Sequence, residues 1–221
     1  MDLPECVEVT TGENPVGSVI WLHGLGADGH DFEPIVPELR LPAELPLRFV
    51  FPHAPVRPVT INGGMHMRAW YDIISLDAEG RADADGVRES TALLDALIER
   101  EIGRGIPEEK IGIAGFSMGG AIVVNKTLTT HRELAGLMAL STYLPVPAAA
   151  ENSSSNRDLP VFMGHGTFDP MVQHPWGKAT AERLTELGFT VEWHDYAMAH
   201  AVCAEEVQDI RDWLLRVYAR A

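Results

Sequence analysis

The sequence predicts an α/β fold in which a mostly parallel central sheet carries helices on both faces. Short runs of apolar and β-branched residues recur along its 221 residues, and segments with helical periodicity separate them. Most of these runs are almost continuously apolar, which is typical of strands buried on both faces of a parallel sheet. Since single hydrophobic cores extend to about 250 residues, we expect one domain over residues 1–221, without a large lid domain.

The expected strands are short and rich in Val, Ile, Leu and Phe. They cover residues 18–23, 48–52, 110–115, 134–140, 160–164 and 190–196, and an edge strand is expected at 6–10. In sheets of this class ligands bind at the carboxyl ends of the strands. Residues that follow these strands are therefore the first candidates for a functional site.

Periodicity predicts two long helices. Between residues 85 and 102 apolar side chains recur on one face, and Gly103 and Gly105 then favour a stop. Near the C-terminus Val207, Ile210, Leu214 and Val217 keep helical spacing, with Glu205 and Glu206 in the favourable first turn. Further helices are expected at about 31–40, 118–129 and 176–187.

The stretch from residue 53 to residue 80 interrupts the alternation of strands and helices. It contains prolines, a Gly63-Gly64 pair and several methionine and aromatic residues. Such a composition predicts a long loop, and long loops in compact domains are usually functional. We expect this loop on the substrate side of the domain.

Composition excludes several classes of partner and cofactor. Lys and Arg number 17 against 32 Asp and Glu, a net charge of −15, which argues against nucleic acid and against stable association with an anionic membrane. Two cysteines and the absence of a His-Glu-x-x-His motif predict neither a metal site nor another cofactor. The acidic start and the lack of a long apolar run predict a cytoplasmic protein.

A Gly-x-Ser-x-Gly motif lies between an expected strand and an expected helix. Gly115 and Gly119 flank Ser117 in a position that permits a tight, strained turn. The serine oxygen would then project above the sheet near the positive end of a helix. Ser117 is therefore the candidate nucleophile, and a Gly/Ser-rich turn without chemistry is the alternative.

A serine hydroxyl needs a base, and a carboxylate usually orients that base. In hydrolases with this turn the acid and then the histidine follow the serine along the chain. Asp169 and His200 both follow expected strands, so they are the candidate acid and base. His165 is expected to brace the Asp169 loop, and Asp195 lies too close to His200 in sequence to orient it easily.

An oxyanion intermediate is normally stabilised by two backbone N–H groups. One candidate is the amide of Met118, directly after the nucleophile. The other is the amide of Leu25, in the glycine-rich segment after the first parallel strand. His23, which precedes that segment, is expected to be structural.

Three further residues are candidates for substrate binding. Met65 and Trp70 lie in the 53–80 segment, and Met171 lies beside Asp169. Methionine suits adaptable apolar pockets. Ordinary core packing beneath a long loop remains the alternative for these side chains.

Several blocks of sequence, taken in order, resemble one family along nearly the whole chain. The blocks are Leu22-His23-Gly24-Leu25-Gly26-Ala27-Asp28, Pro58-Val59-Thr60-Ile61-Asn62-Gly63-Gly64, Trp70-Tyr71-Asp72-Ile73, Gly115-Phe116-Ser117-Met118-Gly119-Gly120-Ala121, Leu140-Ser141-Thr142-Tyr143, His165-Gly166-Thr167-Phe168-Asp169 and the loop of His200. The chain is similar to the small serine carboxylesterases grouped with the acyl-protein thioesterases and lysophospholipases in the α/β-hydrolase fold. Two of the blocks look more like the bacterial carboxylesterase branch.

The resemblance implies the same triad and oxyanion amides, and it allows a homodimer. At two positions the chain departs from the family's usual residues, with Met118 in place of Gln and Ala199 in place of Gly. We expect a metal-free hydrolase acting on small-molecule carboxylic esters of short to medium acyl chains through a Ser117 acyl-enzyme. An acyl-protein thioesterase or lysophospholipase with the same triad is the alternative, and a hydrolase-like binding module without catalysis belongs to a different class.

Overall fold

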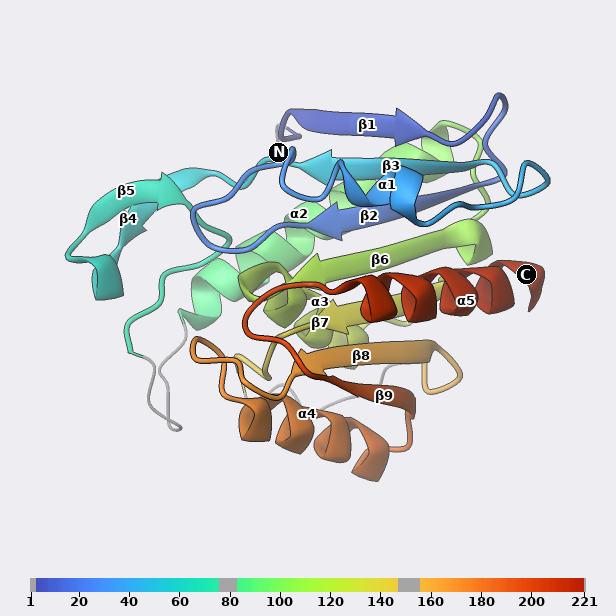
Figure 1. Ribbon diagram of the computed structural model, residues 1–221. Coiled ribbons are helices and arrows are strands. Elements are labelled where there is room, and N and C mark those ends of the chain that lie inside the picture. The colour runs from blue at the N-terminus through green and yellow to red at the C-terminus, as the bar shows by residue number, and fades with distance from the viewer. Residues whose placement is uncertain (1–2, 76–82, 147–155, 221) are drawn as a thin grey trace.

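A seven-stranded sheet forms the centre of the molecule in a computed structural model that describes residues 3–75, 83–146 and 156–220 (Figure 1). The spatial order is β1-β3-β2-β6-β7-β8-β9, and only β1 runs antiparallel to its neighbour. The strands are β1 (Cys6–Thr10), β2 (Gly17–Leu22), β3 (Leu47–Pro52), β6 (Ile111–Phe116), β7 (Gly136–Leu140), β8 (Pro160–Gly166) and β9 (Thr190–Tyr196). The predicted α/β class is confirmed, and so is the edge position of the strand at 6–10.

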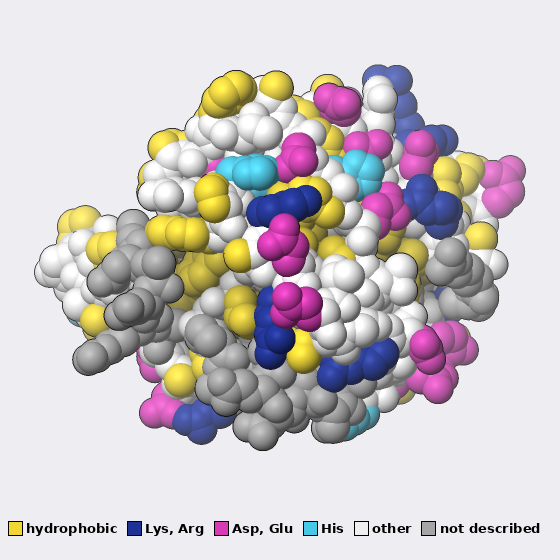
Figure 2. Space-filling view, turned by 90° about the horizontal axis from the view of Figure 1, so that it is seen from below, with side chains coloured by type: hydrophobic (Ala, Val, Ile, Leu, Met, Phe, Trp, Pro, Cys, Tyr) yellow, Lys and Arg dark blue, Asp and Glu magenta, His cyan; other side chains and the backbone are white. Residues whose placement is uncertain are grey.

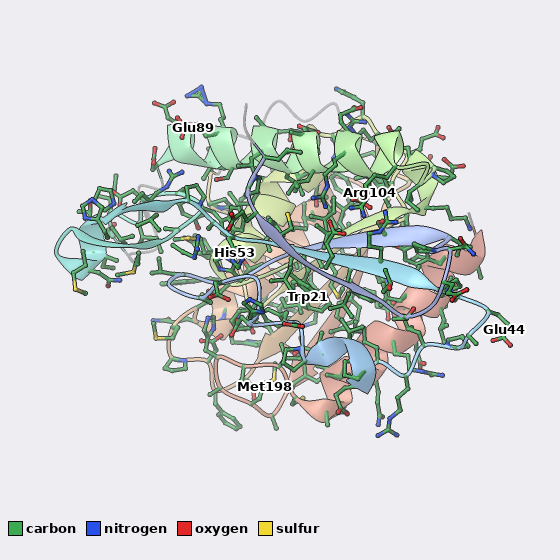
Figure 3. The ribbon with its side chains drawn as sticks, turned by 90° about the horizontal axis from the view of Figure 1, so that it is seen from above. Trp21, Glu44, His53, Glu89, Arg104 and Met198 are labelled. Carbon is green, nitrogen blue, oxygen red and sulfur yellow. The ribbon has the colours of Figure 1, made fainter. Side chains whose placement is uncertain are left out.

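Helices cover both faces of this sheet. The helices α2 (Ala84–Gly103), α3 (Met118–Thr129) and α4 (His174–Glu186) pack on one face, and α1 (Ile35–Glu38) and α5 (Ala204–Arg220) pack on the other. Seen from above, α2 lies on one side of the strands and α1 and α5 lie on the other, with Trp21 on the side of α1 (Figure 3). Because side chains alternate along β2, Ile20 contributes to one core and Trp21 to the other.

The expected helix at 31–40 is much shorter than predicted. Only α1, Ile35–Glu38, is helical. Pro34 stands at its N-cap and Pro37 lies inside it, and a proline disfavours helical backbone at the residue before it. Arg40, with a φ of 45°, follows the last turn. The prolines therefore outweigh the apolar periodicity of this segment.

Other boundaries differ by a few residues. The helix at 118–129 agrees with α3, whereas α4 begins at His174 and its C-cap is Leu187. β7 begins at Gly136, two residues after the expected start, and β6 continues to Phe116. α2 begins after Asp83, whose carboxylate accepts a hydrogen bond from the Gly86 amide at 2.9 Å.

The stretch expected to be one long loop contains a β-hairpin. The antiparallel strands β4 (Val56–Val59) and β5 (Met65–Arg68) are joined by a 3-10 turn, Thr60–Asn62. Gly63 and Gly64 then adopt φ angles of 66° and 77°, which glycine tolerates without strain. The hairpin stands beyond the carboxyl ends of the parallel strands (Figure 1), and residues 76–80 of the predicted loop lie outside the described residues.

None of the helices in the described ranges combines the length and the hydropathy that a membrane span requires.

Candidate active site

Ser117 occupies a strained turn between β6 and α3. Its φ and ψ angles are 54° and −117°, a conformation that costs a non-glycine residue about 1–3 kcal/mol. Backbone contacts hold the turn, since the Ser117 amide donates to the Leu140 carbonyl at 2.9 Å. The Ser117 carbonyl accepts from the Thr142 hydroxyl at 2.7 Å and from the Ala121 amide at 3.0 Å. The strain is therefore maintained by the surrounding structure, as is usual at functional sites.

The glycines of the motif allow this turn because there is no room for a side chain. A Cβ on Gly115 would lie 2.4 Å from the backbone of Gly119. A Cβ on Gly119 would lie 2.5 Å from the carbonyl oxygen of Leu22, at the end of β2. The start of α3 thus packs directly against the end of the neighbouring strand, and the motif fixes this approach.

Asp169 and His200 come together at the carboxyl end of the sheet. Asp169 follows β8, and its buried Oδ2 accepts a hydrogen bond from His200 Nδ1 at 2.6 Å. Its other oxygen accepts the amides of Met171 and Val172 at 2.8 and 2.9 Å. With Nδ1 bound to Asp169, His200 presents Nε2 as the nitrogen available to a reacting group.

His200 also lies beside the turn that carries Ser117. Its ring centroid is 4.7 Å from that of Phe116, the residue immediately before the serine. The loops after β8 and β9 are bonded to each other, because the Phe168 amide donates to the Met198 carbonyl at 3.1 Å. Ala199, a position at which the family resemblance implies glycine, does not adopt a positive φ angle, so alanine causes no backbone strain there.

The alternative acid and bases have other partners. The Asp195 carboxylate accepts hydrogen bonds from His174 Nε2 and from the Trp193 indole, at 2.5 and 2.9 Å. His165 is completely buried, and its Nε2 donates to the Val172 carbonyl at 2.9 Å, so it braces the Asp169 loop as expected.

The loop after β2 approaches Ser117 through Gly24. A Cβ on Gly24 would lie 3.5 Å from the Cβ of Ser117. Within the described part of the chain, the amides of Leu25 and Met118 donate to no protein acceptor, which leaves both available to a ligand. Such unpaired N–H groups beside a serine are what an oxyanion site requires.

His23 precedes this loop and is held in one neutral tautomer. Its Nε2 accepts the Ala54 amide at 3.0 Å, so the proton resides on Nδ1, which donates to the Gly24 carbonyl at 2.7 Å. Burial lowers the pKa of His23 to about 4. The structural interpretation of His23 agrees with these contacts.

The three candidate substrate-binding residues differ in exposure. Met65 and Met171 expose 61% and 56% of their surface, near the carboxyl end of the sheet. Trp70 is completely buried, so it belongs to the core and is not part of an open pocket wall. Figure 2 shows hydrophobic side chains at the left of the molecule, the end at which β4 and β5 lie in Figure 1.

Thr142 supports the turn of Ser117, a role that the sequence did not predict. Its hydroxyl donates a hydrogen bond to the carbonyl of Ser117, the candidate nucleophile, and its Cβ lies 2.7 Å from the position that a Cβ on Gly120 would take. Thr142 follows β7, and a polar residue at the carboxyl end of a central strand was the available signal.

Among the described residues no cluster of three or more His, Cys, Asp or Glu is suited to a metal ion.

The parallel sheet, the strained serine turn at a strand end and the acid–histidine pair define an α/β-hydrolase. The chain belongs to the phospholipase/carboxylesterase family, whose model matches residues 4–217. It is a hydrolase of that family.

The similar proteins include fungal and plant members. The acyl-protein thioesterase 1 of Cryptococcus neoformans var. neoformans is 37% identical over 229 residues, covering 95% of each chain. The acyl-protein thioesterase 1 of Neurospora crassa is 39% identical over 208 residues, covering 89% of this chain and 85% of that protein. The crystal structure of SOBER1 from Arabidopsis thaliana is 32% identical, with a TM-score of 0.84 over 91% of this chain and 99% of the other.

Proposed function

We propose that this protein is an acyl thioesterase that removes acyl groups from cysteine side chains of proteins through a Ser117 acyl-enzyme. The observation that carries the proposal is the 37–39% identity to proteins named acyl-protein thioesterase 1, over most of both chains. The sequence reasoning ranked oxygen esters first and thioesters second. The similarity supports the second of these more strongly, because the triad itself acts on either bond.

The chemistry follows from the contacts of the site. His200 Nε2 removes the proton from the Ser117 hydroxyl while Asp169 stabilises the resulting imidazolium. Ser117 Oγ attacks the acyl carbonyl carbon, and the amides of Leu25 and Met118 bind the oxyanion. The C–S bond breaks and the thiolate takes the proton from His200. Water, activated by the same histidine, then releases the carboxylic acid and restores Ser117.

Short to medium oxygen esters are the second candidate substrate. The family description itself includes carboxylesterases, and the triad and oxyanion amides act on the acyl half that both substrates share. The leaving group therefore has to be varied separately from the acyl chain in any test.

The decisive experiment compares one peptide carrying an S-acyl cysteine with the same peptide carrying an O-acyl serine. Acyl chains from acetyl to palmitoyl are used in both series. We expect kcat/KM for the thioester to exceed that for the ester by at least about tenfold after correction for spontaneous hydrolysis, equivalent to about 1.4 kcal/mol. A higher rate on the oxygen esters at every chain length would establish the carboxylesterase function in its place.

Two serine variants make the assignment specific to the site. Ser117→Ala removes the proposed nucleophile and should abolish turnover of both series. Ser141→Ala removes a buried hydroxyl that has no hydrogen-bond partner among the described residues, so it should retain activity. Turnover that survives in Ser117→Ala would contradict the acyl-enzyme mechanism, and wild-type protein inactive on both series would favour the binding-module alternative.

A further inference from the structure

The polar groups of Trp70 are all engaged, although the residue makes no contact with solvent. The side chain is completely buried and its ring lies 5.3 Å from the ring of His23. Its backbone amide donates to Met118 Sδ at 3.2 Å, and its indole Nε1 donates to the His23 carbonyl at 2.9 Å. The Ser90 hydroxyl of α2 donates to its carbonyl oxygen. Trp70 is thus fixed from three directions.

One of these bonds reaches Met118, which carries one proposed oxyanion amide, and another reaches His23, two residues before Leu25, which carries the second. Met118 supplies one amide directly from its own backbone. On the other side, the His23 carbonyl belongs to the peptide that precedes Gly24, and His23 Nδ1 donates to the Gly24 carbonyl at 2.7 Å. The Gly24 carbonyl and the Leu25 N–H belong to the same planar peptide unit, so a bond that orients the first also orients the second.

We propose that Trp70 is a positioning residue that sets the distance and orientation between the Leu25 and Met118 amides through Met118 Sδ and His23. This inference rests on the proposed function, in which these two amides bind the oxyanion. A hydrogen-bonded path runs from the side chain of Met118 through Trp70 to His23, and from His23 to the peptide of Leu25.

The path has two physical consequences for the reaction. Hydrogen bonding at the Gly24 carbonyl polarises the peptide, which makes the Leu25 N–H a stronger donor. Fixed donors also need no reorganisation when the oxyanion forms, and this pre-organisation is the main source of their effect. The two amides bind the oxyanion more strongly than they bind the carbonyl oxygen of the substrate. Loss of Trp70 should therefore lower kcat more than it changes KM.

Met118 supplies the acceptor at one end of this path. The residue is 2% exposed, and its sulfur accepts the hydrogen bond of the Trp70 amide. Met118→Leu keeps the volume and removes the acceptor. It therefore tests the path from the opposite end without changing the oxyanion amide itself.

The test uses Trp70→Phe, which removes the indole N–H and retains an aromatic side chain. Trp21→Phe is the matched control, because Trp21 is also buried at 1% exposure but its Nε1 has no hydrogen-bond partner among the described residues. Hydrolysis of the substrate preferred by the wild type is measured, together with inhibition by a trifluoromethyl ketone that bears the same acyl chain. Such a ketone forms a tetrahedral oxyanion with serine and therefore reports the donors directly.

For Trp70→Phe we expect kcat to fall about 10- to 100-fold with KM changed by less than about threefold, and inhibitor affinity to fall in parallel with kcat/KM. Trp21→Phe should keep kcat within about twofold. Met118→Leu should lower kcat by a smaller factor, and the double variant should show less than the product of the two effects, since both act on one path.

Equal kcat values in Trp70→Phe and Trp21→Phe would overturn the inference, and so would a loss confined to KM. If Trp70→Phe does not fold, Met118→Leu decides, and unchanged inhibitor affinity in that variant would also overturn it. Failure of the proposed function is distinct from these results, because it is measured on the wild type, which would then either prefer oxygen esters at every chain length or hydrolyse neither series.

Discussion

The loops after β2 and β9 each place a histidine near Ser117, yet the two histidines have opposite surroundings. His23 is 2% exposed, and both of its ring nitrogens bond to backbone groups, Gly24 and Ala54. The His200 side chain is 18% exposed, and one nitrogen bonds to the carboxylate of Asp169. The first ring has no nitrogen left for chemistry, whereas the second keeps one.

The difference shows that position at a strand end is insufficient to define a base. A histidine can exchange protons only if one nitrogen is free and its charged form is stabilised. His200, in the loop after β9, meets both conditions, because Asp169 bonds to one ring nitrogen and the other remains available. His23, after β2, instead bonds to the peptide that joins Gly24 and Leu25. Each loop therefore contributes a different part to the proposed mechanism, a base from one and a backbone donor from the other.

Replacing the base should produce the largest effect. His200→Ala removes the only proton acceptor proposed for Ser117, so kcat should fall by about 10⁴-fold or more. Steady-state hydrolysis of the preferred substrate measures this. His194→Gln is the control, because His194 bonds to Glu192 on β9 and should leave kcat near the wild-type value. Comparable losses of kcat in the two variants would show that His200 has no special role as the base.

Asp169→Asn should produce the next largest loss of kcat. Oδ1 is held by the amides of Met171 and Val172, so the new NH₂ group would face His200 Nδ1 and favour the wrong tautomer. We expect a loss of about 10³- to 10⁴-fold in kcat at unchanged stability. Asp195→Asn, whose carboxylate bonds to His174, serves as the control, and an equal loss there would point to Asp195 as the acid.

Two substitutions of His23 separate its donor from its acceptor. Asn retains a donor at the place of Nδ1, which bonds to Gly24, whereas Gln retains an acceptor at the place of Nε2, which bonds to Ala54. If orientation of the oxyanion peptide matters, His23→Gln should lose about 10- to 100-fold in kcat and His23→Asn less. The opposite order, measured at matched folded fractions, would assign His23 to Ala54 alone.

The pH dependence of stability is expected to reflect two buried groups, His23 and Glu206. Burial lowers the pKa of His23 to about 4. Between pH 6.5 and about 4 the histidine is therefore protonated in the unfolded chain but neutral in the folded chain, so the free energy of unfolding falls as the pH decreases through this range. Glu206, in the first turn of α5, is completely buried, and both carboxylate oxygens lack a hydrogen-bond partner among the described residues. Desolvation, aided by Asp209, raises its pKa to about 8, so stability should fall as pH increases from 4.5 to about 8.

Urea unfolding across these two ranges tests both groups. His23→Gln should flatten the acid range by up to about 3 kcal/mol, and Glu206→Gln should flatten the alkaline range by up to about 5 kcal/mol. If the curves of both variants keep the wild-type shape, neither buried group contributes to the pH dependence of unfolding.

The hydrophobic pattern predicted the sheet and most helices, because short apolar runs that alternate with segments of helical periodicity are typical of parallel strands buried on both faces. It failed where local chemistry overrode it. The prolines at 34 and 37 shortened α1, and the Gly63-Gly64 turn allowed a hairpin where the sequence predicted a loop. The prolines and the glycine pair are both visible in the sequence. Whether they override the hydrophobic periodicity depends on the tertiary contacts of each segment.

For the site, the sequence by itself determined the candidate residues and their order, since the serine motif and strand ends are local features. Only the tertiary structure decided their partners. It joined Asp169 to His200, assigned Asp195 to His174, and buried Trp70 between Met118 and His23. It also placed Glu206, a favourable residue for a first helical turn, against Gly164, where its carboxylate has no hydrogen-bond partner within the described part of the chain. Hydrogen bonds between distant segments depend on the packing of the whole sheet, and sequence spacing does not contain that information.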